Sequence, residues 1–192
     1  MKKLMSLAAA VLLAAIAAGA AGNPRVLVKT EAGDIVIEVR ADKAPATAAN
    51  FLRYVDAGLY DGTAFFRTVT PGNQPKDKIR IEVIQGGQVD EAREFPPIAH
   101  ETTRRTGLSH ADGAVSMARD KPGTAASSFF ICIKDQPELD FGGRRNPDGQ
   151  GFAVFGRVVS GWRVVRTIQR RPARGQQLEP PVRIISIRRI EH

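Results

Sequence analysis

The stretch GAVSMARDKPGTAASSFFICI, residues 113–133, contains two short runs of β-forming character, at 113–118 and 128–133. β-branched and aromatic residues in such runs favour a half-buried strand. Runs of the same kind recur outward along the chain, at 26–28, 35–39, 64–69, 79–84, 153–158 and 182–190. Glycine (18 residues) and proline (12 residues) are abundant, which is typical of many short elements joined by turns. The sequence therefore predicts seven or eight strands.

Two segments have the spacing of helices that bury one side. In 44–57, Phe51, Leu52 and Val55 fall on one stripe, and Pro45 suits a first helical turn. The segment 162–169 repeats the helical spacing. Because strands and helices do not alternate regularly, a parallel sheet is not indicated. The prediction is a mainly β protein, a closed antiparallel barrel with helices over its ends.

The first twenty residues have the three-part layout of a secretory signal peptide. A basic start with two lysines precedes an apolar run at 4–18, and small residues at 18–20 form a cleavage site. The apolar run is short for a membrane span, and no stop-transfer segment follows it. We therefore expect a signal peptide at 1–20, a single domain at 21–192, no membrane anchor and a periplasmic location.

Composition and motif content exclude several classes of protein. The net charge is +8, but the late arginines, between 163 and 189, are accompanied by a single aromatic residue, Trp162. This favours solvated basic faces over a nucleic-acid interface. The lone Cys132 excludes an internal disulfide, and the three histidines lack metal-ligand spacing. Nucleophile elbow, phosphate loop and dinucleotide fingerprint are absent. We expect no nucleic acid, no metal and no cofactor.

Six short motifs, in order along the chain, together point to one family. They are FFR at 65–67, IQGG at 84–87, SMAR at 116–119, SSFFI at 127–131, LD at 139–140 and VFGRV at 154–158. In these motifs the sequence resembles the cyclophilins, peptidyl-prolyl cis-trans isomerases, over roughly residues 25 to 190. The resemblance implies an eight-stranded antiparallel barrel capped by two α-helices. It also implies a monomer that acts without a cofactor on unfolded or flexible proline-containing polypeptides.

The resemblance assigns roles to individual residues. Arg67 matches the catalytic arginine, Gln85 the glutamine that supports it, and Phe130 the phenylalanine that floors the proline pocket. Eight further residues match substrate-binding positions or replace residues that occupy them: Phe65, Phe66, Val83, Met117, Ala118, Ser128, Leu139 and Phe152. The sequence leaves open whether Phe65 belongs to the core or to the pocket wall.

The sequence departs from the family pattern on part of the pocket wall. Phe66 replaces a histidine, and about ten extra residues, near 73–81, separate Arg67 from Gln85. After these extra residues, Glu82 and Val83 stand where the family usually has phenylalanine and methionine, and Ser128 replaces a glutamine. Phe152 stands in place of a histidine. These changes concern rate and substrate range more than fold.

Three functions from different classes agree with these residues. The first is an exported prolyl isomerase that assists the folding of envelope proteins. The second is a catalytically weak peptide-binding module or holdase chaperone, which the altered pocket residues Glu82 and Val83 favour. The third is a structural envelope-interaction protein that uses its basic face. Retention of Arg67, Gln85 and Phe130 together favours the enzyme, because a binding module needs no guanidinium beside a proline pocket.

Overall fold

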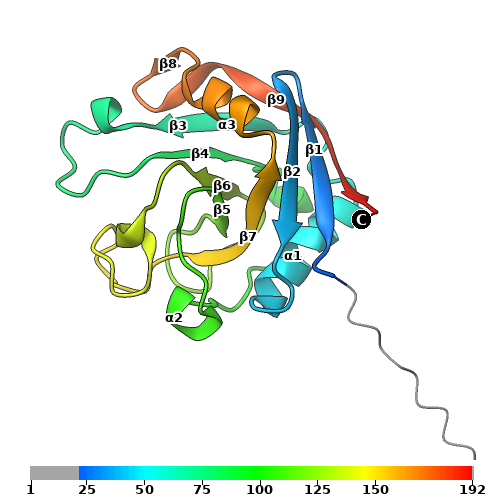
Figure 1. Ribbon diagram of the computed structural model, residues 1–192, viewed down its shortest axis with the longest axis horizontal. Helices are drawn as coiled ribbons and strands as arrows, with labels where there is room; N and C mark the ends of the chain where they lie inside the picture. Colours follow the sequence, from blue (N-terminus) through cyan, green and yellow to red (C-terminus); the bar gives the residue numbers. More distant parts are fainter. Residues whose placement is uncertain (1–21, 192) are drawn as a thin grey trace, which may run out of the picture.

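The computed structural model describes residues 22–191 (Figure 1), and the predicted signal peptide, residues 1–20, lies outside them. The strands are β1 Arg25–Thr30, β2 Gly33–Val39, β3 Ala64–Val69, β4 Val83–Gly86, β5 Ala114–Met117, β6 Phe129–Cys132, β7 Ala153–Ser160, β8 Ala173–Arg174 and β9 Gln177–Ile190. The α-helices are α1 Pro45–Asp56, α2 Thr103–Thr106 and α3 Trp162–Gln169, and short 3-10 helices are η1 Pro71–Asn73, η2 Glu91–Arg93 and η3 Pro137–Leu139.

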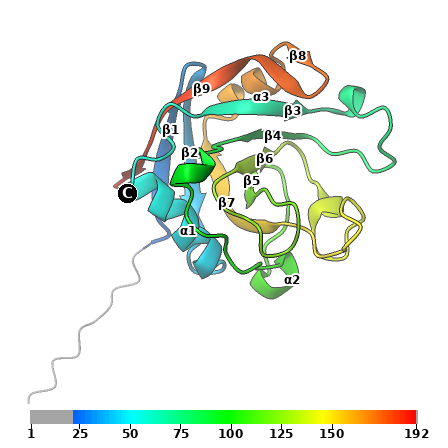
Figure 2. The ribbon, with the colours of Figure 1, turned by 180° about the vertical axis from the view of Figure 1, so that it is seen from behind.

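Eight of the strands close into a barrel, in the order β1-β2-β7-β5-β6-β4-β3-β9, with β9 pairing back onto β1. All of these pairings are antiparallel, and β8 only adds a two-residue hairpin beside β9. The views from the two sides place α1 and α3 on opposite sides of the barrel (Figures 1 and 2). The predicted fold, a closed eight-stranded antiparallel barrel with two principal helices, is confirmed. Within residues 22–191, no helix is both long and apolar enough to cross a membrane.

The predicted strand at 79–84 is the largest error in the expected elements, because the strand begins only at Val83. Before it, side chains satisfy the backbone groups that a neighbouring strand would otherwise bind. Gln74 is 1% exposed, and its amide bonds both the N–H and the C=O of Ile81. Arg145 donates from Nη1 to the carbonyl oxygen of Ile79 at 2.6 Å. The extra residues therefore form a side-chain-braced loop and not a longer strand.

A β-bulge at Phe66 decides which side chains of β3 face the barrel interior. Phe65 pairs with Gly86, while Arg67 pairs with the adjacent residue Gln85, so one extra residue lies on β3. Regular alternation would put Phe65 and Arg67 on the same face. The bulge puts them on opposite faces, with Phe65 in the interior core and Arg67 outside it.

Helix α1 begins without a cap of its own, and Glu101 supplies one from a distant loop. Ala44, at the N-cap position, makes no side-chain capping bond. The carboxylate of Glu101, 4% exposed, accepts from the backbone N–H groups of Ala46 (3.3 Å) and Thr47 (2.7 Å), and from the Thr47 hydroxyl (2.7 Å). A negative group at the N-terminus of a helix also interacts favourably with the helix dipole.

Replacing Glu101 by alanine is expected to lower the free energy of unfolding by about 2 kcal/mol, because three donors, two of them buried, lose a charged acceptor. Glu101→Gln keeps an acceptor oxygen and should recover part of the loss. Glu31→Ala, at the exposed β1–β2 turn, is the control. The measurement is the urea midpoint. Equal midpoints for Glu101→Ala and Glu31→Ala would show that the cap contributes nothing.

Candidate active site

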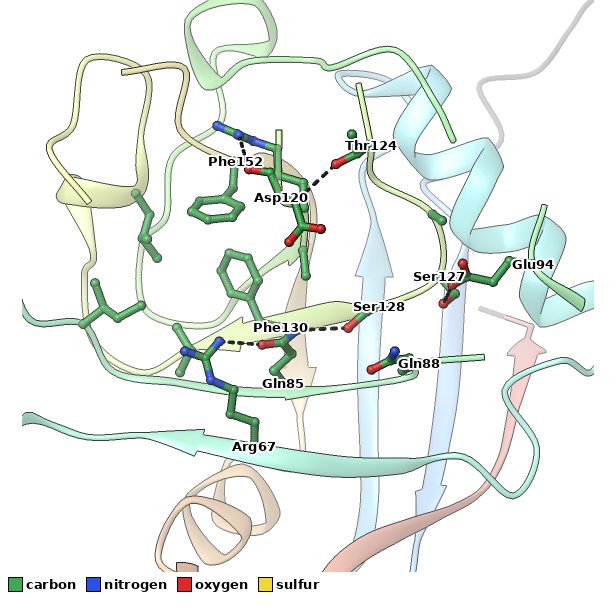
Figure 3. Close-up of a pocket in the computed structure, with 16 residues that line it drawn as sticks. Arg67, Gln85, Gln88, Glu94, Asp120, Thr124, Ser127, Ser128, Phe130 and Phe152 are labelled. Atoms are coloured by element: carbon green, nitrogen blue, oxygen red, sulfur yellow. Dashed lines mark hydrogen bonds between the residues drawn. The ribbon is translucent and has the colours of Figure 1, made fainter. Parts of the chain in front are cut away.

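A cavity of about 350 Å³ opens on the outer face of β3, β4 and β6, beside the loops that follow β5 and η3 (Figure 3). A small apolar cluster that includes Val83, Phe130, Leu139 and Val154 packs beneath it, apart from the barrel interior. Eight of the eleven residues that the sequence assigns to a site line this cavity: Arg67, Val83, Gln85, Ala118, Ser128, Phe130, Leu139 and Phe152. The structure therefore brings the expected catalytic and substrate-binding positions together.

The other three predicted residues, Phe65, Phe66 and Met117, do not line the cavity. Phe65 and Met117 are fully buried in the interior core, so the open alternative for Phe65 is decided in favour of core. Met117 pairs with Phe129, which also faces the interior. Phe66 is the partly buried extra residue of the bulge. The bulge and the pleat turn Phe65 and Met117 toward the interior core, so the structure does not bring these three residues to the cavity.

Arg67 is held from two sides by glutamine oxygens. Its Nη1 donates to Gln85 Oε1 at 2.8 Å, and its Nε and Nη2 donate to Gln176 Oε1 at 2.9 and 2.6 Å. Gln85 is fixed in turn, since its amide nitrogen donates to Ser128 Oγ at 3.1 Å (Figure 3). A guanidinium has five N–H donors, so two remain beyond these bonds. Burial lowers the pKa of Arg67 from its ordinary value, yet an arginine stays charged at working pH.

Gln176 is a site residue that sequence reasoning missed. It lies at the turn between β8 and β9, far from Arg67 along the chain, and no motif marks it. Its amide nitrogen donates to the carbonyl oxygen of Asn73 at 3.3 Å, and the Asn73 amide donates to the carbonyl oxygen of Gly175 at 3.1 Å. Asn73, at the start of the inserted loop, therefore helps to position Gln176, which in turn binds Arg67.

For the prolyl isomerisation that the resemblance implies, Gln176→Ala is expected to lower kcat about fivefold to tenfold, because Arg67 loses the acceptor of two N–H groups and can rotate. KM and the melting temperature should change little. The matched control is Gln177→Ala, since Gln177 is the exposed next residue. Similar kcat values for the two variants would contradict a positioning role for Gln176.

One half of the cavity is apolar. Phe130 forms its floor at 5% exposure, and the ring of Phe152 meets it edge-on, with centroids 5.3 Å apart and an interplanar angle of 87°. Leu139 and Val83 complete the predicted set, and Ile81 adds a wall from the inserted loop. No motif marks Ile81, which lies where the expected strand does not form. This half has the shape and chemistry to take a small apolar ring.

The other half of the cavity is polar, and its lining residues are not among the site residues that the sequence predicts. Gln88, Glu94, Asp120, Thr124 and Ser127 line it, with Glu94 and Ser127 on the side away from Arg67 (Figure 3). Glu94 accepts a short hydrogen bond from the Ser127 hydroxyl. Both hydroxyls of this half are bonded within the protein, so the groups that it offers to a bound chain are the carboxylates of Glu94 and Asp120 and the exposed amide of Gln88.

Arg119 lines the cavity wall, and its positive charge is paired with the carboxylate of Asp148. Its guanidinium, 1% exposed, binds both carboxylate oxygens of Asp148 at 2.8 and 3.0 Å and lies 5.2 Å from the ring centroid of Phe152. The hydrogen bond from Arg119 is the main reason that the pKa of Asp148 falls to about 2. Arg119 also donates to the carbonyl oxygen of Gly151 at 2.9 Å, which ties the 140–151 loop to the cavity.

These features can bind a peptide and polarise one bond of it without covalent chemistry. In the part of the chain that the structure covers, no three His, Cys, Asp or Glu side chains gather as a metal site. What the cavity presents is a fixed guanidinium with two free donors beside an apolar floor. Such a group acts by electrostatic stabilisation of a bound species.

Known proteins resemble this chain in sequence and in structure. The family model "Cyclophilin type peptidyl-prolyl cis-trans isomerase/CLD" matches residues 25–189. The peptidyl-prolyl cis-trans isomerase cyp18 of Streptomyces antibioticus is 38% identical over 145 residues, 73% of this chain and 80% of that protein. A peptidyl-prolyl cis-trans isomerase of Acinetobacter baylyi is 34% identical over 182 residues, 90% of this chain and 88% of that protein. A cyclophilin-type isomerase of Cryptosporidium parvum, crystallised in the presence of the dipeptide Ala-Pro, shares the fold, with a TM-score of 0.69 at 22% identity, and the match covers 88% of this chain and 99% of that chain.

Proposed function

This chain belongs to the cyclophilin-type peptidyl-prolyl cis-trans isomerases, and from that membership we propose that it catalyses cis-trans isomerisation of X-Pro bonds in exported polypeptides in the periplasm. It is an isomerase by family, as its relatives are. The observation that carries its mechanism is the guanidinium of Arg67, fixed by Gln85 and Gln176 beside the apolar floor of Phe130.

The reaction needs stabilisation of a twisted bond and no covalent step. Conjugation of the C–N bond sets a rotational barrier of about 18–20 kcal/mol, and prolyl bonds interconvert over about 10–100 s at 25 °C. In the twisted state the nitrogen regains its lone pair and can accept a hydrogen bond. We propose that the proline ring lies against Phe130 and that a free N–H of Arg67 donates to this nitrogen. That interaction exists only in the twisted state, so it lowers the barrier.

The location in the cell rests on the N-terminal segment. A basic start, an apolar run at 4–18 and small residues at 18–20 are typical of a cleaved signal peptide. The proposed substrates are therefore unfolded or flexible proline-containing segments of exported proteins, and the proposed working form is a soluble monomer. The basic surface is proposed to stay solvated and not to bind nucleic acid.

Two measurements test this proposal. The protein beginning at Ala21 should accelerate cis-trans exchange of X-Pro peptides and shorten the proline-limited phase of a refolding exported protein. A protein that suppresses aggregation of the refolding chain without accelerating exchange would instead be the peptide-binding module or holdase that Glu82 and Val83 favour. In cells, N-terminal sequencing should find a start near Ala21 in the soluble periplasmic fraction. An intact Met1 in the membrane pellet would overturn the export assignment.

A further inference from the structure

A buried hydrogen-bonded cluster lies directly behind the apolar half of the cavity, and none of its members lines that cavity. His110 is 1% exposed, its Nδ1 lies 2.7 Å from Asp140 Oδ1, and its Nε2 lies 3.0 Å from Ser116 Oγ. The backbone N–H of His110 donates to the same Asp140 oxygen at 3.0 Å. The mechanism described above uses none of these groups.

The partners fix the hydrogen positions on the imidazole. Asp140 Oδ1 already accepts one N–H, and an ionised carboxylate can only accept, so Nδ1 carries the ring hydrogen. In the neutral ring Nε2 is then an acceptor for the Ser116 hydroxyl. Ser116 is fully buried, and within residues 22–191 its Oγ has no other hydrogen-bond partner. The Ser116 hydroxyl hydrogen therefore has an acceptor only while His110 is neutral.

Each member of the cluster adjoins a side chain of the apolar half, through ring stacking, strand pairing or sequence. The His110 ring is stacked on Phe130, with centroids 5.9 Å apart and an interplanar angle of 10°, and it meets Phe152 edge-on at 6.4 Å. Ser116 is the cross-strand partner of Phe130. Asp140 follows Leu139 in the chain. The cluster thus joins three of the side chains that form the floor and walls of this half, Phe130, Phe152 and Leu139.

We propose that His110, as a neutral imidazole bonded to Asp140 and Ser116, is a positioning residue that fixes Phe130, Phe152 and Leu139 for the proline ring, and that its protonation loosens them. The inference rests on the proposed function in taking the apolar half as the proline subsite. Protonation turns Nε2 into a donor, which leaves the buried Ser116 hydroxyl without an acceptor. Isomerisation itself moves no proton, so an acid limb in the rate reports on the protein and not on the reaction.

The charged and titratable groups around His110 set where this limb falls. Burial lowers the pKa of His110 from its ordinary value, and the Asp140 carboxylate opposes that shift. Burial raises the pKa of the Cys132 thiol on β6, so that group stays neutral. Arg119, beyond Phe152, is paired with Asp148, and the Asp112 carboxylate is occupied by the backbone N–H of Lys134. Asp140 is therefore the charged group whose removal should shift the pKa of His110.

The experiment measures kcat/KM against pH, from about 8 to about 4.5, with an X-Pro peptide that has no titratable side chain. The wild type should hold a plateau at neutral pH and fall in acid with a midpoint below about 6.5, and the ring-nitrogen NMR signals of His110 should titrate with the same midpoint. Asp140→Asn keeps an acceptor oxygen but removes the charge, so the midpoint should move to lower pH. His110→Phe keeps a ring against Phe130 but loses both bonds, so kcat/KM should fall about tenfold at neutral pH, without an acid limb.

The matched control is His100→Gln, which should leave both plateau and limb unchanged, because among residues 22–191 the His100 side chain bonds the carbonyl oxygen of Gln150 and no other group. Thermal unfolding of every variant at each pH separates a change in rate from loss of fold. A wild-type profile that stays flat while His110 titrates, or an Asp140→Asn midpoint that does not move, overturns the inference even where His110→Phe fails to fold. Absence of activity in the wild type at neutral pH would instead count against the proposed function.

Discussion

Arg67→Ala is expected to lower kcat/KM for an X-Pro peptide by about 10²–10³, the loss typical when one preorganised donor is removed from an active site. The loss should fall mainly on kcat, because the proposed hydrogen bond forms only with the twisted imide. The fold should persist, since Arg67 stands outside the interior core and its two partners, Gln85 and Gln176, keep other hydrogen bonds. The measurement is steady-state isomerisation with active protein quantified by its folded fraction.

Arg67→Lys separates charge from geometry. An ammonium keeps the charge but cannot reach two glutamine oxygens in a fixed fork, so most of the loss should remain. Arg163→Ala, on the exposed face of α3, is the control for net charge and should behave as wild type. Full activity in Arg67→Ala would remove Arg67 from the mechanism, and full activity in Arg67→Lys would show that charge alone is sufficient.

How far the sequence predicts this molecule depends on whether a feature leaves a local pattern. The helix at 162–169 has a 3.6-residue period and is predicted with the bounds that the structure has. The strand expected at 79–84 also has a local pattern, but the Gln74 side chain takes the backbone bonds of Ile81. A side chain from outside the segment that replaces a strand partner has no signature in the sequence of the segment itself.

The site shows the same division. Arg67, Gln85 and Phe130 follow from motifs, and the cavity collects all three. Phe65 could not be placed, because a bulge adds a residue without a composition of its own and reverses the faces beyond it. Gln176 reaches Arg67 through tertiary contact alone.

The place of Met117 follows from the alternation of faces once the pairing of β5 with β6 is known. The interior and cavity faces alternate along β5 and β6, so a strand that puts Phe130 on the cavity must put Phe129 inside. Met117 is paired with Phe129, whereas Ser116 is paired with Phe130. Two adjacent phenylalanines therefore have different surroundings, and this difference makes them a matched pair for experiment.

Phe130→Ala is expected to lower kcat/KM by about 10²-fold, because the proline ring loses the apolar surface of the cavity floor. Both KM and kcat should suffer, since the ring must be held while the bond twists. Phe129→Ala removes the same side chain one residue earlier, from the interior. There the Phe129 ring packs edge-on against Phe51 and Phe65, at 5.5 and 5.9 Å between centroids. Phe129→Ala should cost about 3–5 kcal/mol of stability while the molecules that remain folded stay active.

The pair therefore predicts opposite outcomes in two assays, stability and activity per folded molecule. Where an alanine variant does not fold, Phe130→Leu and Phe129→Leu keep the comparison, with smaller losses of the same kind. Phe130 is 5% exposed at the cavity floor, so Phe130→Leu should lose activity by more than its change in the melting temperature explains. If Phe129→Leu lost as much activity per folded molecule as Phe130→Leu, the cavity floor would have no special part in catalysis. Activity would then follow the rigidity of β6 as a whole, because the two rings share a strand and differ only in the face they present.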